Sequence, residues 1–162
     1  MRQTLASTSP DSGWPSTAAF RWSPVAEPAQ ARAALRFGVV IPFVDHLGIE
    51  LLGFEEGTPE LAFAPRPEHL NSLGMAHGGA TMTLLDVAMA TAARSVQMEM
   101  AAVTIEMKTS FMRPARGRLI AKGRMMQRTA TMAFTEASLY DDKGRLCAHA
   151  TGTFKYVLPN PA

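Results

Sequence analysis

The sequence predicts an α+β protein in which a curved antiparallel sheet wraps one long helix. Two strand-like segments precede a single long helical segment, and four longer strand-like segments follow it. The connections between the later strands are too short to hold the crossover helices that parallel strands need. A curved antiparallel sheet around the helix is therefore the economical way to bury the apolar residues of both.

Length and composition place the chain in one domain. It has 162 residues, of which 47% are hydrophobic, enough for one core of ordinary size. We expect a mobile tail over residues 1–27, a folded domain over 28–157 and a short tail over 158–162. The first 25 residues contain three prolines and no periodic apolar face. Trp14, Phe20 and Trp22 are the one feature there that favours docking on the folded domain. Because the segment otherwise lacks a face that could pack, we expect deletion of residues 1–25 to leave activity and dimer formation largely unchanged.

The first elements are short. Ala31, Ala34 and Leu35 fit a helix from Pro28 to about Phe37, which Gly38 and Pro42 then end. Two strands are expected after it, from Ile49 to Phe54 and from Glu60 to Ala64, around a turn at residues 56–58.

The longest helical pattern begins at His77 and continues to about Val96. Between Ala80 and Ala93 nearly every residue is small or apolar, which is typical of a helix that is buried all round. Asp86 is the only ionisable side chain in that window. An isolated carboxylate costs several kcal/mol in a dry environment unless it is hydrogen-bonded, paired or protonated. A chemical role for Asp86 is the simplest explanation for its presence.

The remaining chain has the period of strands. Apolar and polar residues alternate over residues 103–112, and three further strands are expected at Leu119 to Gln127, Met132 to Tyr140 and Leu146 to Val157. The turn at residues 141–144 joins the last two as a hairpin.

Composition also excludes several functions. Sixteen Lys and Arg against fourteen Asp and Glu leave a net charge of +2, which does not indicate nucleic-acid binding. No apolar run approaches the roughly 20 residues of a membrane span, and the start of the sequence has no secretory pattern. One cysteine, Cys147, excludes an intrachain disulfide. We therefore expect a cytoplasmic protein that binds neither membrane nor nucleic acid.

No known cofactor or metal pattern is present. The four histidines lack metal-ligand spacing, so neither a metal nor another cofactor is implied. There is no Gly-x-Ser-x-Gly motif and no phosphate-binding Gly-rich loop. Cys147 and His149 share a strand face and could form a thiol nucleophile, but a small buried cysteine is several times commoner.

Three motifs carry a family resemblance over roughly residues 35 to 157. Asn71 stands six residues before His77-Gly78-Gly79, and Asp86 follows nine residues after His77. Together with the segments 43–49, 103–107 and 113–115, this pattern resembles the hotdog-fold acyl-CoA thioesterases of the PaaI-like (phenylacetic acid degradation) group. The resemblance implies the hotdog fold and hydrolysis of an acyl-CoA to the free acid and CoA.

The resemblance also implies roles for the motif residues. Amides at a helix start carry partial positive charge, so the Gly78 N–H would polarise the thioester carbonyl while the Asn71 side chain positions the thioester or water. Asp86 would act as nucleophile or as general base. Thr104 would lie near the water, and His77 would orient the loop through hydrogen bonds rather than act as a base.

Substrate contacts and assembly follow from the same resemblance. Gly79 and Met82 are expected at the substrate, and Met75 and Met89 are further candidates for an acyl pocket. Arg113 and Arg116 are expected near the CoA phosphates, although a solvated strand face explains any single one of them equally well. Asp86 would face Asn71 and Gly78 of another chain, which requires a homodimer or a dimer-of-dimers tetramer with sites at the interface.

Three other functions are possible on this fold. A dehydratase or hydratase acting on acyl-CoA or acyl carrier protein would place a catalytic histidine on the helix, where this chain has Asp86. A non-catalytic acyl-CoA-binding protein would lack the carboxylate or add a DNA-binding segment. A purely structural oligomer would leave Asp86 without a purpose. Because one fold hosts many functions, the site residues decide among these alternatives.

Overall fold

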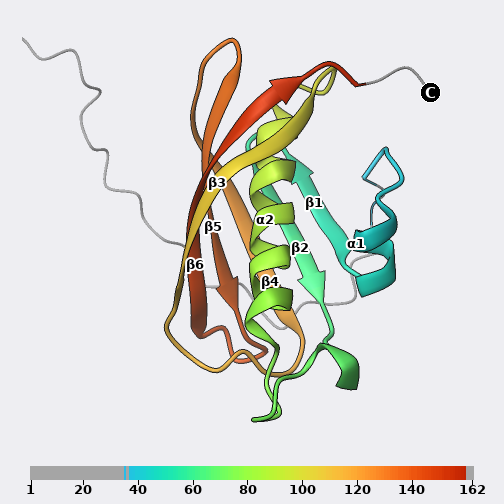
Figure 1. Cartoon of the computed structure of the whole chain (residues 1–162), viewed down its shortest axis with the longest axis vertical. Coiled ribbons are helices and arrows are strands. Elements are labelled where there is room, and N and C mark those ends of the chain that lie inside the picture. Colours follow the sequence, from blue (N-terminus) through green and yellow to red (C-terminus); the bar gives the residue numbers. More distant parts are fainter. Residues whose placement is uncertain (1–34, 36, 160–162) are drawn as a thin grey trace, which may run out of the picture.

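The structure is a computed structural model that describes Leu35 and residues 37–159 (Figure 1). Its elements, in chain order, are α1 (Pro42–Leu47), β1 (Glu50–Glu55), β2 (Thr58–Phe63), the 3-10 helix η1 (Pro67–His69), α2 (Gly78–Ser95), β3 (Ala101–Phe111), β4 (Leu119–Arg128), β5 (Met132–Tyr140) and β6 (Leu146–Val157). The expected N-terminal tail and the last residues of the expected C-terminal tail lie outside the described residues. None of the described helices is long and apolar enough to cross a membrane.

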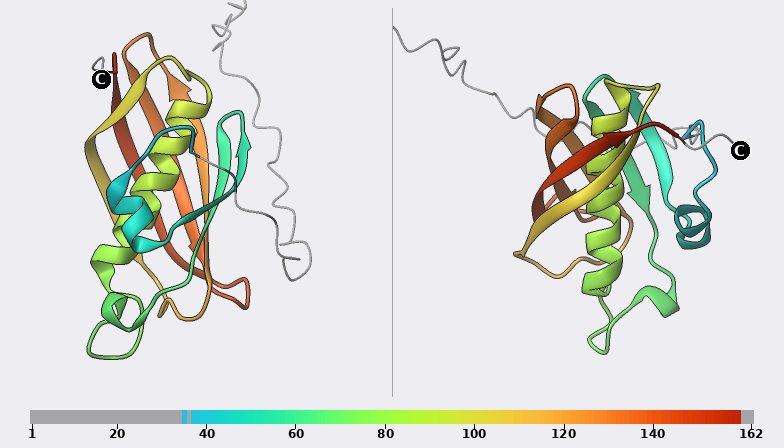
Figure 2. Two further views of the ribbon diagram at one scale, coloured as in Figure 1. Left: turned by 90° about the vertical axis from the view of Figure 1, so that its right-hand side faces the viewer. Right: turned by 45° about the horizontal axis from the view of Figure 1, so that its top comes forward.

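The six strands form one sheet in the order β1-β2-β4-β5-β6-β3, and every neighbouring pair is antiparallel. The sheet bends around α2, as the two views of Figure 2 show. One edge strand, β1, comes before α2 in the chain, and the other edge strand, β3, comes directly after it. This is the α+β hotdog architecture that the sequence predicts, and all six strands begin and end within two residues of the expected bounds.

The helix α2 packs on the concave face of the sheet. Its inward residues Leu84, Leu85, Ala88, Met89 and Ala92 have no exposed surface. A Cβ atom added at Gly123 of β4 would collide with the carbonyl oxygen of Ala88, so a glycine is needed there for the helix to approach the sheet this closely. Close contact between helix and sheet fixes the position of α2, and with it the position of every side chain that α2 carries.

One side of α2 is nevertheless open, so the expectation of a helix buried all round is wrong for the single chain. Gly79 and Met82 are exposed, and Asp86, Val87 and Ala90 are only half-buried. These positions recur every three to four residues and therefore lie along one stripe. The physical reason is that one curved sheet covers only part of a helix circumference, so the small and apolar residues of this stripe have no cover within the chain.

The neighbouring edge of the sheet is also apolar and open. On β3, the side chains of Val103, Ile105 and Phe111 are 49%, 55% and 55% exposed, and the unpaired edge of β3 ends the sheet. An open, apolar edge strand is a template for pairing with another chain. The open stripe of α2 and the edge of β3 together form a surface that differs from the polar outside of a typical monomer.

Two short elements, α1 and η1, were not predicted, and the predicted helix end near Phe37 was wrong. Pro42, interpreted as a helix breaker, instead occupies the first turn of α1, where its missing N–H costs nothing. The expected helix from Pro28 to Phe37 lies mostly outside the described residues. Its end is not helical, because the Leu35 N–H donates to the carbonyl of Leu51 at 2.7 Å in an isolated β-bridge.

Candidate active site

The start of α2 is fixed by His77. The imidazole Nδ1 of His77 accepts a hydrogen bond from the Gly79 N–H at 3.0 Å, and the His77 carbonyl accepts from the Thr81 N–H at 3.0 Å. The His77 N–H donates in turn to the carbonyl of His69 at 2.8 Å. An accepting Nδ1 carries no proton, so in the neutral ring the proton is on Nε2. His77 thus has the contacts of a helix cap that orients the loop.

Gly78 and Gly79 are glycines for different reasons. A Cβ at Gly79 would lie 3.2 Å from the His77 Nδ1 atom and would disturb the cap. A Cβ at Gly78 would meet only the Phe111 ring, at an ordinary 3.7 Å. The Gly78 N–H also finds no acceptor among the described residues. Because the chain itself gives no reason for a glycine at 78, its unhindered amide is suited to close approach by a group outside the chain.

Asn71 braces the loop before α2 and keeps a donor free. Its side-chain Oδ1 accepts from the Leu73 N–H at 2.9 Å and from the Met75 N–H at 3.4 Å. These two backbone donors identify the oxygen of the amide, so the NH₂ group is the part left for another partner. No described residue accepts a hydrogen bond from that group. Asn71 therefore offers a second donor near Gly78.

A cavity of about 400 Å³ opens at this end of the helix. Asn71, Gly78 and Thr81 line it from the helix side, and the segment after β3 lines it from the other. That segment is held in place because the Cys147 carbonyl accepts from the N–H groups of Met112 at 2.8 Å and Arg113 at 3.0 Å. The rest of the lining is mostly apolar: Met75, Ala76, Phe111, Met112, Pro114, Ala115, Cys147 and Ala148.

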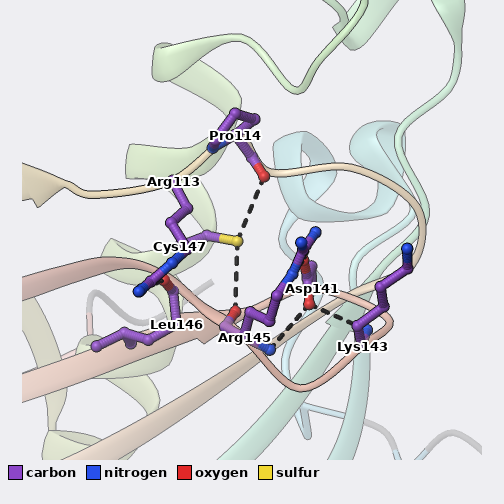
Figure 3. A network of polar contacts seen from close by, with 7 residues as sticks. All are labelled: Arg113, Pro114, Asp141, Lys143, Arg145, Leu146 and Cys147. Atoms are coloured by element: carbon purple, nitrogen blue, oxygen red, sulfur yellow. Dashed lines mark hydrogen bonds and ion pairs between the residues drawn. The ribbon is translucent and has the colours of Figure 1, made fainter.

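The cysteine in the cavity wall is structural. Cys147 is 1% exposed, and its Sγ lies 3.5 Å from the Pro114 carbonyl and 3.4 Å from the Arg145 carbonyl (Figure 3). Burial, with the nearby carboxylate of Asp141, raises the pKa of the Cys147 thiol and so disfavours the thiolate. His149 is hydrogen-bonded to Ser138 at 3.0 Å instead of to the thiol. These contacts support the interpretation of Cys147 as a buried cysteine.

The turn between β5 and β6 anchors the strand that carries Cys147. The Asp141 carboxylate, in a residue that is 3% exposed, accepts from the Lys143 and Arg145 N–H groups at 3.0 and 2.9 Å and from the Arg145 guanidinium at 2.7 Å (Figure 3). Burial opposes ionisation, but these hydrogen bonds outweigh it and lower the pKa of Asp141. The network gives the far wall of the cavity a rigid support.

Asp86 lies elsewhere, on the open stripe of α2. Its Oδ1 accepts a hydrogen bond from the Thr104 hydroxyl of β3 at 2.8 Å. Burial raises the pKa of Asp86, and the hydrogen bond from Thr104 opposes that rise. A desolvated carboxylate held by one hydroxyl is a more basic group than a solvated one. This is the state expected of a nucleophile or general base.

The two halves of the predicted site do not meet within one chain. Asp86 is not part of the cavity wall that contains Asn71 and Gly78. It follows Gly78 by eight residues on the same helix, which corresponds to about 12 Å along the helix axis. One carbonyl group cannot reach across that distance. The structure thus brings Asn71 and Gly78 together, and separately Asp86 and Thr104.

The two arginines of the prediction have different surroundings. Arg113 lines the cavity and donates to the Leu146 carbonyl at 3.0 Å. The Arg116 guanidinium donates to the carbonyls of Gly74 and Leu73 at 2.7 and 3.0 Å, so it braces the loop before α2. Several other cations of this region are paired with carboxylates across the sheet: Arg118 with Glu50, Lys122 with Glu60 and Arg124 with Glu136.

The methionines and one threonine complete the comparison with the sequence. Met75 lines the cavity, Met82 is on the open stripe, and Met89 is fully buried in the core, which argues against a pocket role for Met89. Sequence reasoning missed Thr81. Its spacing of three residues from Gly78 was the available signal, because residues three apart share one side of a helix.

Comparisons with known proteins agree with this geometry. Residues 73–148 match the model of the family described as the Thioesterase superfamily. A Saccharolobus solfataricus protein named "Putative esterase SSO2140" is 28% identical over 113 residues, which cover 69% of this chain and 80% of that protein. The family description is that of thioester hydrolases, and the name of the relative is that of an ester hydrolase.

Solved structures show the same fold. A thioesterase family protein from Silicibacter pomeroyi is 27% identical with a TM-score of 0.70, covering 74% of this chain and 91% of that one. A mutant of the phenylacetic acid degradation protein PaaI from Thermus thermophilus is 28% identical with a TM-score of 0.66, covering 72% and 100%. These findings identify the chain as a hotdog-fold protein whose match to the Thioesterase superfamily spans α2 and the strands beside it.

Proposed function

We propose that this protein is an acyl-CoA thioesterase that works as at least a dimer, with each site shared between two chains. The observation that carries the proposal is the free Gly78 amide at an apolar cavity, on the same helix as a desolvated carboxylate that it cannot meet within the chain. The Thioesterase superfamily match over the same residues supports it.

Gly78 and Asn71 supply the donors for the thioester carbonyl. The Gly78 N–H is at the positive end of α2, and the Asn71 NH₂ group lines the same cavity. Two donors without a partner in the chain stabilise the oxygen as negative charge develops on it in the transition state. The apolar wall beyond them suits an acyl group better than it suits the polar CoA portion of the substrate.

Asp86 of the other chain supplies the base or nucleophile. As nucleophile, its carboxylate oxygen attacks the thioester carbon, CoA leaves as the thiolate, and water then hydrolyses the mixed anhydride to the free acid. As general base, it removes a proton from water as the water attacks, and CoA leaves directly. In either case the carboxylate must be ionised, and the Thr104 hydroxyl keeps it oriented by its hydrogen bond at 2.8 Å.

The open surface of the chain supports sharing between two copies. The stripe of α2 that carries Asp86 and the edge of β3 are apolar and uncovered in one chain. A two-fold axis beside β3 would pair the two edges and place the α2 helices side by side in opposite directions. In antiparallel helices, residues that are about 12 Å apart along one helix can face each other across the pair. Asp86 of one copy could then face Gly78 of the other.

The CoA phosphates need cations, and Arg113 is the better placed of the two predicted residues. It lies at the cavity wall, and its recorded partner is one backbone carbonyl. Arg116 donates to two carbonyls of the loop before α2. We therefore expect Arg116 to affect loop geometry and Arg113 to affect affinity for CoA.

The proposal is tested by thiol release and by subunit mixing. A panel of acyl-CoAs assayed for free CoA should show turnover by the wild type. For mixing, Asp86→Asn removes the carboxylate, and Gly78→Pro removes the amide N–H at a helix position where proline is well tolerated. Each variant alone should be nearly inactive. In an equal mixture half of the dimers are mixed and one of their two sites has both groups, so about a quarter of wild-type activity should return.

The same mixture also excludes a site contained in one chain. If Gly78 and Asp86 of the same chain acted together, every chain in the mixture would carry a defect and no activity would return. Subunit exchange is verified with two differently tagged variants recovered as one complex. The absence of recovery after verified exchange would contradict the shared site, and the absence of thiol release from the whole panel by wild type would contradict the thioesterase.

A further inference from the structure

One buried residue of α2, Thr81, has a hydroxyl without a partner among the described residues. The described residues contain five buried polar or charged side chains: His69, Thr81, Thr91, Thr135 and Asp141. Four of them are hydrogen-bonded, His69 to the Arg66 N–H, Thr91 to the Val87 carbonyl, Thr135 to the Gly152 carbonyl and Asp141 to its own turn. Thr81, which is 2% exposed, makes no side-chain hydrogen bond within the part of the chain that the structure describes. The Thr81 hydroxyl is not sealed from solvent, unlike that of Thr109, and such a group in a native protein is usually paired with water or a ligand.

The other threonines of α2 show what a helical threonine ordinarily does. The hydroxyl of Thr83 donates to the Gly79 carbonyl at 3.0 Å, and that of Thr91 donates to the Val87 carbonyl at 2.6 Å. Both use the carbonyl four residues earlier, the usual acceptor for a threonine inside a helix. The corresponding acceptor for Thr81 is the His77 carbonyl, which accepts the backbone N–H of Thr81 but not its hydroxyl.

The free hydroxyl belongs to the cavity. Thr81 lines the space of about 400 Å³ that begins at Gly78, and most other wall residues there are apolar. Thr109 provides the contrast: its hydroxyl is sealed from any space and lines no part of this cavity. The Thr81 hydroxyl is therefore the side-chain polar group that α2 presents to this mostly apolar wall, beside the backbone amide of Gly78.

The helix sets the distance between Thr81 and the proposed position of the thioester carbonyl at Gly78. Thr81 follows Gly78 by three residues, about 4.5 Å along the axis and on the same side of the helix. An acyl group whose carbonyl oxygen is at the Gly78 N–H must extend past Thr81. An oxygen one or a few carbons beyond the thioester carbonyl would lie within reach of the hydroxyl.

We propose that Thr81 selects oxygenated acyl groups: its hydroxyl binds a hydroxyl or keto oxygen of the acyl chain, so hydroxyacyl-CoA or oxoacyl-CoA thioesters are preferred over plain hydrocarbon ones. This inference rests on the proposed thioesterase function and narrows its substrate. The physical reason is that a hydrocarbon acyl group would displace water from the Thr81 hydroxyl and leave it unpaired. A site that hydrogen-bonds a substrate hydroxyl rejects the analogue that lacks it.

The test uses matched substrate pairs that differ by one oxygen. Butyryl-CoA is compared with 3-hydroxybutyryl-CoA, and hexanoyl-CoA with 3-hydroxyhexanoyl-CoA and 3-oxohexanoyl-CoA, as ratios of kcat/KM. Wild type should prefer the better oxygenated member by roughly tenfold or more. Thr81→Val, which replaces the hydroxyl by a methyl group of similar size, should remove the preference by raising kcat/KM for the hydrocarbon member. Thr81→Ser should keep it.

Thr91→Val is the matched control. It removes a buried hydroxyl from the same helix, but one that is bonded to the Val87 carbonyl and lies away from the cavity. The preference should be unchanged in this variant, while its melting temperature should fall. Thr81→Val should melt at the same temperature as wild type or higher, because it removes a hydroxyl without a partner.

Binding separates the failure of this inference from the failure of the thioesterase. In the Asp86→Asn background the same pairs are titrated by calorimetry, so that affinity is measured without turnover. Tighter binding of the oxygenated member that is lost with Thr81→Val supports the inference even if no thiol is released by wild type. Equal affinity for both members, or a preference that survives Thr81→Val, overturns it whether or not the protein is a thioesterase.

Discussion

The first turn and the middle of α2 present two different kinds of surface. Around Gly78 the chain supplies its own surroundings: the His77 cap, the Asn71 loop and a cavity wall supported by the turn at Asp141. Around Asp86 the chain supplies one hydrogen bond, from Thr104, and otherwise leaves an open stripe beside an open strand edge.

This difference indicates which part of the chemistry one chain can complete. A carbonyl-binding site needs fixed donors and an enclosed wall, and the first turn has both. A carboxylate becomes more basic as it is removed from solvent, and one chain leaves Asp86 half-buried. A second copy against the stripe would bury Asp86 further and raise its pKa further. The middle of the helix is therefore where assembly is expected to change the chemistry most.

The largest expected effect is at Asp86. Replacement by Asn keeps the shape and removes the charge, so turnover should fall by roughly a hundredfold or more. Because burial raises the pKa of Asp86 in the folded protein, its charge destabilises the fold above that pKa. The variant should therefore melt at the same or a higher temperature at pH 7, with the difference disappearing as the pH falls below the ordinary aspartate value. Turnover close to that of wild type, with an unchanged melting curve, would contradict the role of Asp86.

At the first turn, two variants of Gly78 separate the amide from the space around it. Gly78→Pro removes the N–H and should lower kcat by roughly a hundredfold. His77 has a ψ of 143°, the extended conformation that a following proline requires, so the fold should be kept. Gly78→Ala keeps the N–H, and its Cβ makes only an ordinary contact with Phe111. It should lose much less activity. Equal losses in both variants would mean that space at Gly78, and not the amide, limits the reaction.

The smallest effect is expected at Thr104. Its hydroxyl favours the ionised form of Asp86, so Thr104→Val should raise the pKa of that carboxyl further. Activity requires the ionised form, so the rising limb of the kcat/KM profile should move to higher pH. At pH 7 the loss should be roughly tenfold or less. A pH profile that does not move would show that the hydrogen bond at 2.8 Å does not control ionisation. Thr83→Val, on the same stripe but bonded to Gly79, is the control.

The strands were predictable because their signal is local. Alternation of apolar and polar residues placed β5 and β6 at their observed bounds, Met132–Tyr140 and Leu146–Val157. The short α1 was missed because the meaning of a proline depends on the residues that follow it: a proline can end a helix, but Pro42 begins one. Leu35 was misplaced because its partner, Leu51, is distant in the sequence.

The sequence by itself determined the order of the elements and the separation of Gly78 and Asp86 along α2, because helical rise converts spacing into distance. Only the tertiary structure decided which side of α2 is left open, since that depends on how far the sheet curves around it. It also decided that Arg116 braces a loop and that the Thr81 hydroxyl is unpaired at the wall of the cavity. Hydrogen bonds between distant segments depend on packing, and no pattern along the chain records them.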